Sequence, residues 1–117
     1  MRAGGRDGPS ALSPELLQDA AGRFGLLASP MRLHIVWLLA QQDMDVGALA
    51  EAVGGSLPAV SQQLAKLKLA GLVRSQRDGR RQVYVVDDPA LVAMVRLAFE
   101  HLGGAPPSRE RRDGLGA

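Results

Sequence analysis

Two stretches of the sequence concentrate side chains that can hydrogen-bond to polar edges or neutralise anions. Residues 56–68 interleave Ser, Gln and Lys with apolar residues, and residues 77–81 read Arg-Asp-Gly-Arg-Arg. Residues 56–81 hold six Lys and Arg against one Asp, a local net charge of +5 in a chain whose net charge is +2. A basic segment on an otherwise mildly acidic chain is typical of a phosphate-facing surface, whereas the alternative for any charge run is a solvated surface.

The elements around these stretches follow the order of a helix-turn-helix with a wing. A short apolar helix is expected from about residue 46, and the pair Gly54-Gly55 ends it. Ser56 caps the next helix, with Pro58 in its first turn. Strand-like runs at residues 72–76 and 82–86 are joined by an Asp-Gly hairpin turn. This order puts a helix and a basic finger on one side of the molecule and predicts DNA binding.

Three further helices complete the predicted domain. Helices open at Ser13-Pro14 and Ser29-Pro30, and a last one opens at Asp88-Pro89 and runs to about Leu102. Asp43 or Asp45 caps the short third helix. The second helix is apolar on most sides, so it is expected to be covered on most sides.

The last helix predicts self-association. Its apolar residues surround most of its circumference, and only Arg96 and Glu100 form a polar stripe. One apolar face can cover the subunit's own core, and the other needs a partner, for which a symmetric second copy is the economical candidate. We therefore predict a homodimer through the first and last helices. The residues assigned to its interface are Leu16, Leu91, Met94, Val95, Ala98 and Leu102.

Composition predicts the limits of the folded domain and the cellular location of the protein. Gly, Pro and charged residues dominate residues 1–12 and 103–117, which are predicted to be disordered tails around one domain at residues 13–102. No apolar run approaches the ~20 residues that span a bilayer, and the charged, glycine-rich start lacks the apolar stretch of a signal peptide. We expect a cytoplasmic protein without membrane contact.

An enzyme is not expected. The chain has no cysteine, its two histidines fall on different predicted helices, and no glycine pattern follows a strand to bind phosphate. Aromatic residues make up 3% of the chain, which argues against a stacking platform for single-stranded nucleic acid.

At this level of detail the sequence resembles the ArsR/SmtB family of bacterial metalloregulators, which are small dimeric winged-helix repressors. The resemblance covers about residues 26–102, and its order and spacing are more specific than any one motif. The matching stretches are residues 27–33, 46–50, 59–67, 70–73 and 77–84. It implies a mainly α fold with four helices, a two-stranded hairpin and a last helix, in which the fourth helix enters the major groove.

Carried over by position, the resemblance implies a set of DNA contacts. Ser61 and Gln62 fall where base edges are read, because hydroxyl and amide groups can pair with purine edges. Leu57 stands where many members carry a polar residue, which predicts apolar contact with a thymine methyl. Phosphate or minor-groove contacts are expected from Ser56, Gln63, Lys66, Arg77, Arg80 and Arg81.

The metal ligands of the family are only partly present. At the third-helix site, Asp45 and Gly47 stand where cysteines are usual, so that site is absent. At the last-helix site, Asp88 and His101 occupy two of four ligand positions shared between the subunits. Each also has a structural explanation, Asp88 as a helix cap and His101 at the negative end of a helix dipole.

Oxygen and nitrogen ligands favour Ni(II), Zn(II) or Co(II) over thiophilic ions. The wing and recognition helix look most like the actinobacterial branch that responds to nickel and cobalt, although the last-helix ligands of that branch are not retained. Ala90 and Gly104 replace the other two ligands of the last-helix site.

Three functions follow as alternatives. The first is a dimeric regulator that binds a palindromic operator and responds to a metal or another effector. The second keeps the DNA site without a sensor, as a constitutive binder or one controlled by a partner protein. The third is a protein-interaction module whose winged helix no longer binds DNA.

Overall fold

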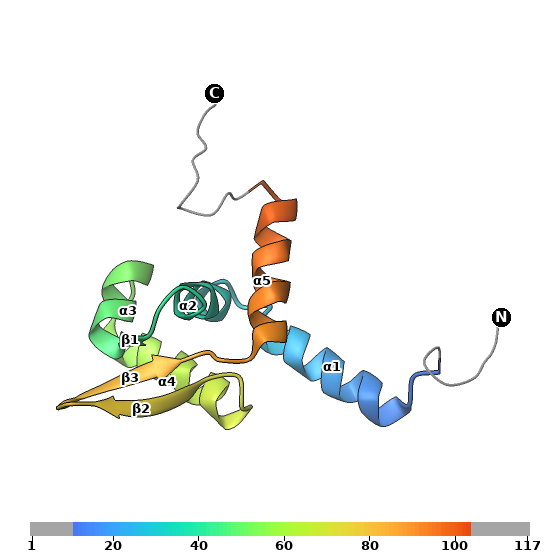
Figure 1. Ribbon diagram of the computed structural model, residues 1–117, viewed down its shortest axis with the longest axis horizontal. Coiled ribbons are helices and arrows are strands. Elements are labelled where there is room, and N and C mark those ends of the chain that lie inside the picture. Colours follow the sequence, from blue (N-terminus) through green and yellow to red (C-terminus); the bar gives the residue numbers. More distant parts are fainter. Residues whose placement is uncertain (1–10, 104–117) are drawn as a thin grey trace.

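A computed structural model of the chain describes residues 11–103 (Figure 1). Residues 1–10 and 104–117, which include most of the two predicted tails, lie outside the described residues. Five helices and a small sheet follow one another in the order α1, α2, β1, α3, α4, β2, β3, α5. Their bounds are α1 Pro14–Leu26, α2 Pro30–Leu39, β1 Met44–Asp45, α3 Val46–Val53, α4 Leu57–Leu69, β2 Arg74–Asp78, β3 Arg81–Val85 and α5 Pro89–His101.

Each helix begins at a polar cap. The side-chain oxygen of the cap accepts a hydrogen bond from a backbone N–H of the first turn, which the helix itself leaves without a partner. The caps are Ser13, Ser29, Asp45, Ser56 and Asp88, as predicted, with Asp45 serving at α3 rather than Asp43. At the other end of α3, Gly54 adopts the left-handed conformation with φ +74°, which a side chain would disfavour.

The core lies where α2, α3, α4 and α5 meet. Its fully buried side chains include Ile35 and Val36 of α2, Leu49 of α3, and Leu64 and Leu67 of α4. No polar side chain among residues 11–103 is fully buried. The core therefore rests on apolar packing, and its α4 members fix which face of that helix is left for solvent.

The sheet has three antiparallel strands in the order β1-β3-β2. β2 and β3 form the predicted hairpin with Asp78 opposite Arg81, so the two-residue loop is Gly79-Arg80, one position later than an Asp-Gly loop. Gly79 has φ +66°, as such tight turns require. The prediction missed β1, which pairs Met44 with Tyr84, because a two-residue strand has no sequence period.

Helix α1 projects from the body on the side away from the wing tip (Figure 1). None of its residues is buried. Large apolar side chains remain exposed on α1 and α5: Leu16 52%, Leu17 51%, Phe24 60%, Met94 41%, Leu97 67% and, just after α5, Leu102 78%. No helix in the described part of the chain is long and apolar enough to cross a membrane.

The predicted dimer surface needs one correction. Leu91 and Val95 are buried within the subunit, with 5% and 2% of their surface exposed, so they pack into its own core. Leu16, Met94, Ala98 and Leu102 are exposed as a second-copy interface requires. Leu97 and Phe24 are also exposed on these helices and were not assigned.

Candidate nucleic-acid interface

The outward face of α4 carries the polar residues singled out from the sequence. Val60, Leu64 and Leu67 are buried against the core, whereas Ser61, Gln62 and Lys66 are exposed. Because residues three and four apart share a helix face, this burial directs a hydroxyl, an amide and an ammonium group into solvent together. Such a face supplies both donors and acceptors to a partner.

The start of α4 presents a polar cap beside an apolar side chain. The Oγ of Ser56 accepts a hydrogen bond from the backbone N–H of Ala59 at 3.2 Å, and its own hydroxyl proton stays available for donation. Leu57 is 52% exposed. The first turn can therefore offer the partial positive charge of the helix end to an anion and a methyl-rich surface to an apolar group.

Gln63 lies at the edge of this face and is half-buried. Its side-chain Oε1 accepts a hydrogen bond from Nη1 of Arg32 in α2 at 2.7 Å. The family resemblance predicted a phosphate contact for Gln63, whereas its pairing with Arg32 could not be predicted, because nothing local in the sequence marks a pair that is 31 residues apart.

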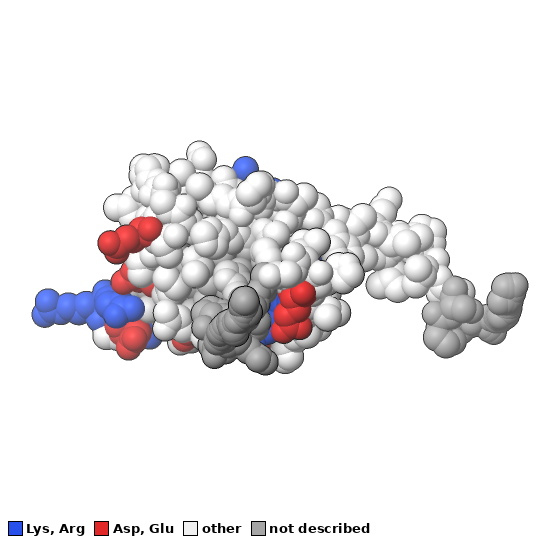
Figure 2. Space-filling model, turned by 90° about the horizontal axis from the view of Figure 1, so that it is seen from above, with Lys and Arg blue, Asp and Glu red and all other residues white. Residues whose placement is uncertain are grey.

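The wing carries the exposed arginines. Figure 2 shows Lys and Arg side chains projecting at the end of the molecule where the wing tip lies. Arg77 and Arg80 are exposed, and Nη1 of Arg77 lies 3.5 Å from the carbonyl oxygen of Arg80. Arg81 is held differently, since its Nε lies 3.3 Å from Oδ2 of Asp45, the cap of α3. Arg77 and Arg80 are thus the tip cations, and Arg81 links the wing to α3.

The wing is tied to the end of α4 by side chains that the sequence did not single out. Nζ of Lys68 donates to Oγ of Ser75 in β2 at 2.9 Å, and Nε2 of Gln82 in β3 donates to the same oxygen at 3.0 Å. Ser75 therefore joins both wing strands to α4. This contact stabilises one angle between the exposed face of α4 and the wing.

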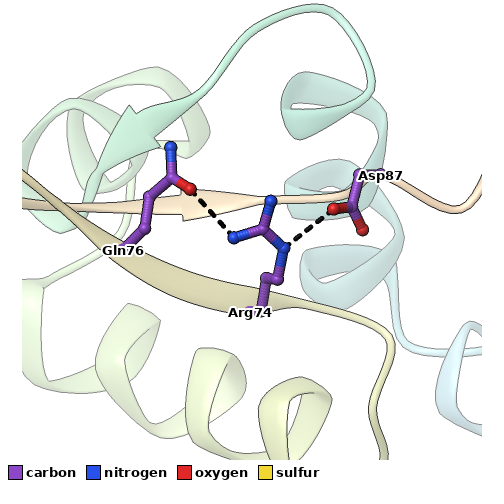
Figure 3. Close-up of polar contacts among 3 residues, drawn as sticks. All are labelled: Arg74, Gln76 and Asp87. Atoms are coloured by element: carbon purple, nitrogen blue, oxygen red, sulfur yellow. Dashed lines mark hydrogen bonds and ion pairs between the residues drawn. The ribbon is translucent and has the colours of Figure 1, made fainter.

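A second connection joins the wing to the segment before α5 (Figure 3). Nε of Arg74 in β2 donates to Oδ2 of Asp87 at 2.8 Å, and its Nη1 donates to Oε1 of Gln76 at 2.9 Å. Asp87 directly precedes Asp88, the cap of α5. The wing base is consequently connected to α4 on one side and to the start of α5 on the other.

The two retained metal-ligand positions do not meet within a subunit. Oδ1 of Asp88 accepts hydrogen bonds from the N–H groups of Ala90 and Leu91, at 3.0 and 3.5 Å. His101 is exposed at the other end of α5, roughly 20 Å away at 1.5 Å per residue. Among residues 11–103 no three His, Cys, Asp or Glu side chains gather to hold a metal, and Gly104 lies outside the described residues. Within residues 11–103 of one subunit, the side chains do not form a site that fits a metal ion.

An apolar groove of about 570 Å³ lies between α1, α2 and α5. Its lining residues are Phe24, Leu27, Leu33, Met94, Val95, Leu97, Ala98 and His101. Exposed apolar side chains of α1 and α5 accompany this groove. An uncovered apolar surface of this kind has the character of an association surface.

Comparison with known proteins agrees with this geometry. Residues 29–75, from the start of α2 into β2, match the family model "Bacterial regulatory protein, arsR family". The HTH-type transcriptional regulator KmtR of Mycobacterium tuberculosis is 37% identical over 110 residues, which are 92% of this chain and 85% of that protein. The chain belongs to the ArsR/SmtB family. Members of the ArsR/SmtB family are transcriptional regulators, and this chain is a DNA-binding regulator of that type.

Solved structures of ArsR/SmtB-type proteins share the fold. The crystal structure of NolR from Sinorhizobium fredii has a TM-score of 0.71 and 36% identity, covering 82% of this chain and 98% of that one. A winged helix-turn-helix domain of Mycobacterium bovis, described as homodimeric and as a possible ArsR-family regulator, has a TM-score of 0.67 and 34% identity over 86% of this chain and 99% of that one. The winged-helix fold predicted from the sequence is confirmed.

Proposed function

We propose that this ArsR/SmtB protein binds an imperfect inverted repeat in duplex DNA as a homodimer, with α4 in the major groove and the wing on the flanking backbone. The observation that carries the proposal is the outward face of α4, where Ser61, Gln62 and Lys66 are exposed while the opposite face is buried. Ser61 and Gln62 read base edges, and Lys66 binds phosphate. Ser56 adds a phosphate contact at the helix start, and Leu57 meets a thymine methyl.

The apolar groove and the exposed faces of α1 and α5 support the twofold arrangement. Helices α1 and α5, which contribute most of the groove's lining residues, lie on the side of the body away from the wing tip (Figure 1), so a second copy bound to them leaves both wings free. The related Mycobacterium bovis domain is homodimeric. Twofold symmetry presents two reading helices, and such dimers read half-sites about one helical turn apart.

Selection from a pool of random-sequence duplexes tests the proposed function. The purified full chain should enrich an inverted repeat whose half-sites are roughly 10 base pairs apart. Its affinity for that duplex should fall steeply with added salt, because bound phosphates release counterions. Enrichment of no sequence, or binding indifferent to both sequence and salt, would count against the proposal.

Removing two arginines of the wing should weaken binding with little effect on sequence choice. Arg80→Ala combined with Arg81→Ala removes four cations from the dimer. The slope of log affinity against log salt concentration should therefore become shallower by about four, or by less if some of these arginines do not contact phosphate. Titrations at several salt concentrations measure this slope.

Arg23→Ala combined with Arg96→Ala is the matched control, because it removes the same charge from α1 and α5. Its salt slope should equal that of the unmodified protein. An unchanged slope in the wing variant, with unchanged affinity, would favour the interaction-module alternative.

Two forms of regulation remain as candidates. Many members of the family sense metal, and antiparallel packing of two α5 helices would bring Asp88 of one subunit toward His101 of the other. The separation of Asp88 and His101 within a subunit, and the absence among residues 11–103 of any cluster of three His, Cys, Asp or Glu side chains, favour a DNA binder without its own metal sensor. Effector control, if metal-based, would involve Ni(II), Zn(II) or Co(II).

Calorimetric titration with Ni(II), Zn(II) and Co(II), with and without the selected duplex, separates the two. A sensor shows saturable metal binding that changes DNA affinity and is lost in His101→Ala. A protein without a sensor shows heats no larger than those of that variant, and its DNA affinity is the same with and without metal.

A further inference from the structure

One arginine outside the winged element bonds to two helices with different roles. Nε of Arg32 in α2 donates to the carbonyl oxygen of Leu26 at 2.7 Å, and its Nη1 donates to Oε1 of Gln63 at 2.7 Å. Leu26 is the last residue of α1, and Gln63 lies in the middle of α4. Both bonds are short, and both are partly shielded from solvent. A single guanidinium therefore connects the projecting helix with the reading helix.

The chemistry of this contact fixes the orientation of the Gln63 amide. A guanidinium has only donors, so it can be satisfied only by the oxygen of the carboxamide. The amide nitrogen of Gln63 must then point away from Arg32. No acceptor in the described part of the chain takes a hydrogen bond from that nitrogen. The side chain is left with two unused N–H donors beside the exposed face of α4.

The contact with Leu26 supports α1 at its end. The last carbonyl groups of a helix have no partner within the helix and carry partial negative charge. Arg32 supplies both a donor and a positive charge there. Because α1 buries no residue of its own, this bond fastens a helix that little else holds to the subunit.

We propose that Arg32 is a positioning residue for DNA binding, which holds the oxygen of Gln63 toward α2 so that Gln63 meets DNA as a hydrogen-bond donor. This inference rests on the proposed function of α4. Its ligand is an acceptor atom of the duplex, either a phosphate oxygen or an acceptor on a base edge such as O6 or N7 of guanine. A two-bond contact with adenine is disfavoured, because it needs the oxygen that Arg32 occupies.

A double-mutant cycle on the selected duplex tests the coupling. Arg32→Met keeps an apolar stem and removes every donor, and Gln63→Ala removes the amide. Each change should weaken binding roughly tenfold, since it affects both subunits. In the Gln63→Ala background, Arg32→Met should cost several-fold less than in the unmodified protein, because the group it positions is gone and only the support of α1 is lost. Equal cost in both backgrounds would overturn the proposal.

Two further variants serve as a control and as an alternative to Arg32→Met. Arg23→Met makes the same chemical change at an exposed arginine of α1 and should leave affinity unchanged. Arg32→Lys keeps the charge but cannot make both bonds in one plane, so it should show the same dependence on Gln63 if Arg32→Met does not fold. Thermal unfolding of each variant separates loss of fold from loss of positioning.

Binding to a second duplex of unrelated sequence shows whether Gln63 donates to a phosphate or to a base. A phosphate contact predicts the same loss from Gln63→Ala on both duplexes, and a base contact predicts loss on the selected duplex alone. If the unmodified protein does not prefer its selected duplex, the proposed function fails. If it does and the Arg32 and Gln63 effects are additive, only this inference fails.

Discussion

Replacing Leu97 by Glu is expected to convert the protein to a monomer and to lower its affinity for the inverted repeat roughly a hundred- to ten-thousandfold. Leu97 is 67% exposed and lines the apolar groove between α1, α2 and α5. A carboxylate there costs the isolated subunit little, but in the dimer it would be buried without a partner. Two monomers must then bind the two half-sites separately. The gain in affinity that comes from linking two reading helices in one dimer is lost.

Sedimentation velocity and duplex titration measure the two effects. Leu69→Glu is the matched control for assembly, because Leu69 is 92% exposed at the end of α4 and does not line the groove. That control should remain dimeric. A dimeric Leu97→Glu protein, or a monomeric one that binds with undiminished affinity, would contradict the twofold arrangement.

Gln62→Ala should remove most of the preference for the selected duplex. An amide that pairs with both polar atoms of an adenine edge contributes about 1–3 kcal/mol of discrimination. The dimer carries this residue twice, so the preference should fall by roughly 2–6 kcal/mol, or about thirtyfold to twenty-five-thousandfold. Competition between the selected duplex and one with both half-sites scrambled measures the ratio.

Lys66→Ala provides the comparison within the same helix. A phosphate contact carries no sequence information, so this variant should bind both duplexes more weakly by a similar factor. The assignment of Gln62 as a base reader would be wrong if Gln62→Ala also weakened both duplexes equally.

Local chemistry explains why most of the fold could be predicted from the sequence. Ser13, Ser29, Ser56 and Asp88 each precede or sit beside a proline at the start of an apolar periodic run, and each caps a helix in the structure. The glycine after α3 and the turn between the wing strands are equally local signals. Such signals depend on residues within one turn of each other, which a sequence shows directly.

Contacts between distant segments could not be predicted in the same way. The bond between Arg32 and Gln63 depends on how α2 packs against α4, and the ion pair between Asp45 and Arg81 depends on how β1 pairs with β3. Lys68 counts as a free cation in the sequence, whereas in the structure it binds Ser75. The neighbouring residues in the sequence thus do not show whether a charged or amide side chain faces solvent or binds another side chain.

Two residues of the predicted dimer surface, Leu91 and Val95, were assigned to the wrong face for a related reason. In a helix that is apolar on most sides, the hydrophobic pattern does not single out one buried face. Its two apolar faces therefore cannot be told apart from the sequence. Leu91 and Val95 belong to the face that packs on the core, and Leu97 belongs to the other. The packing of α5 against α2 decides between them.

The ion pair between Arg74 and Asp87 has a consequence for signal transmission. A ligand that displaced the start of α5 would have to move β2 as well or break the ion pair between Arg74 and Asp87. Both are more than half exposed, with 52% and 60% of their surface accessible, and exposed pairs contribute at most about 1 kcal/mol. The ion pair therefore couples α5 only weakly to the wing, and α5 can shift relative to β2 at a small cost in free energy.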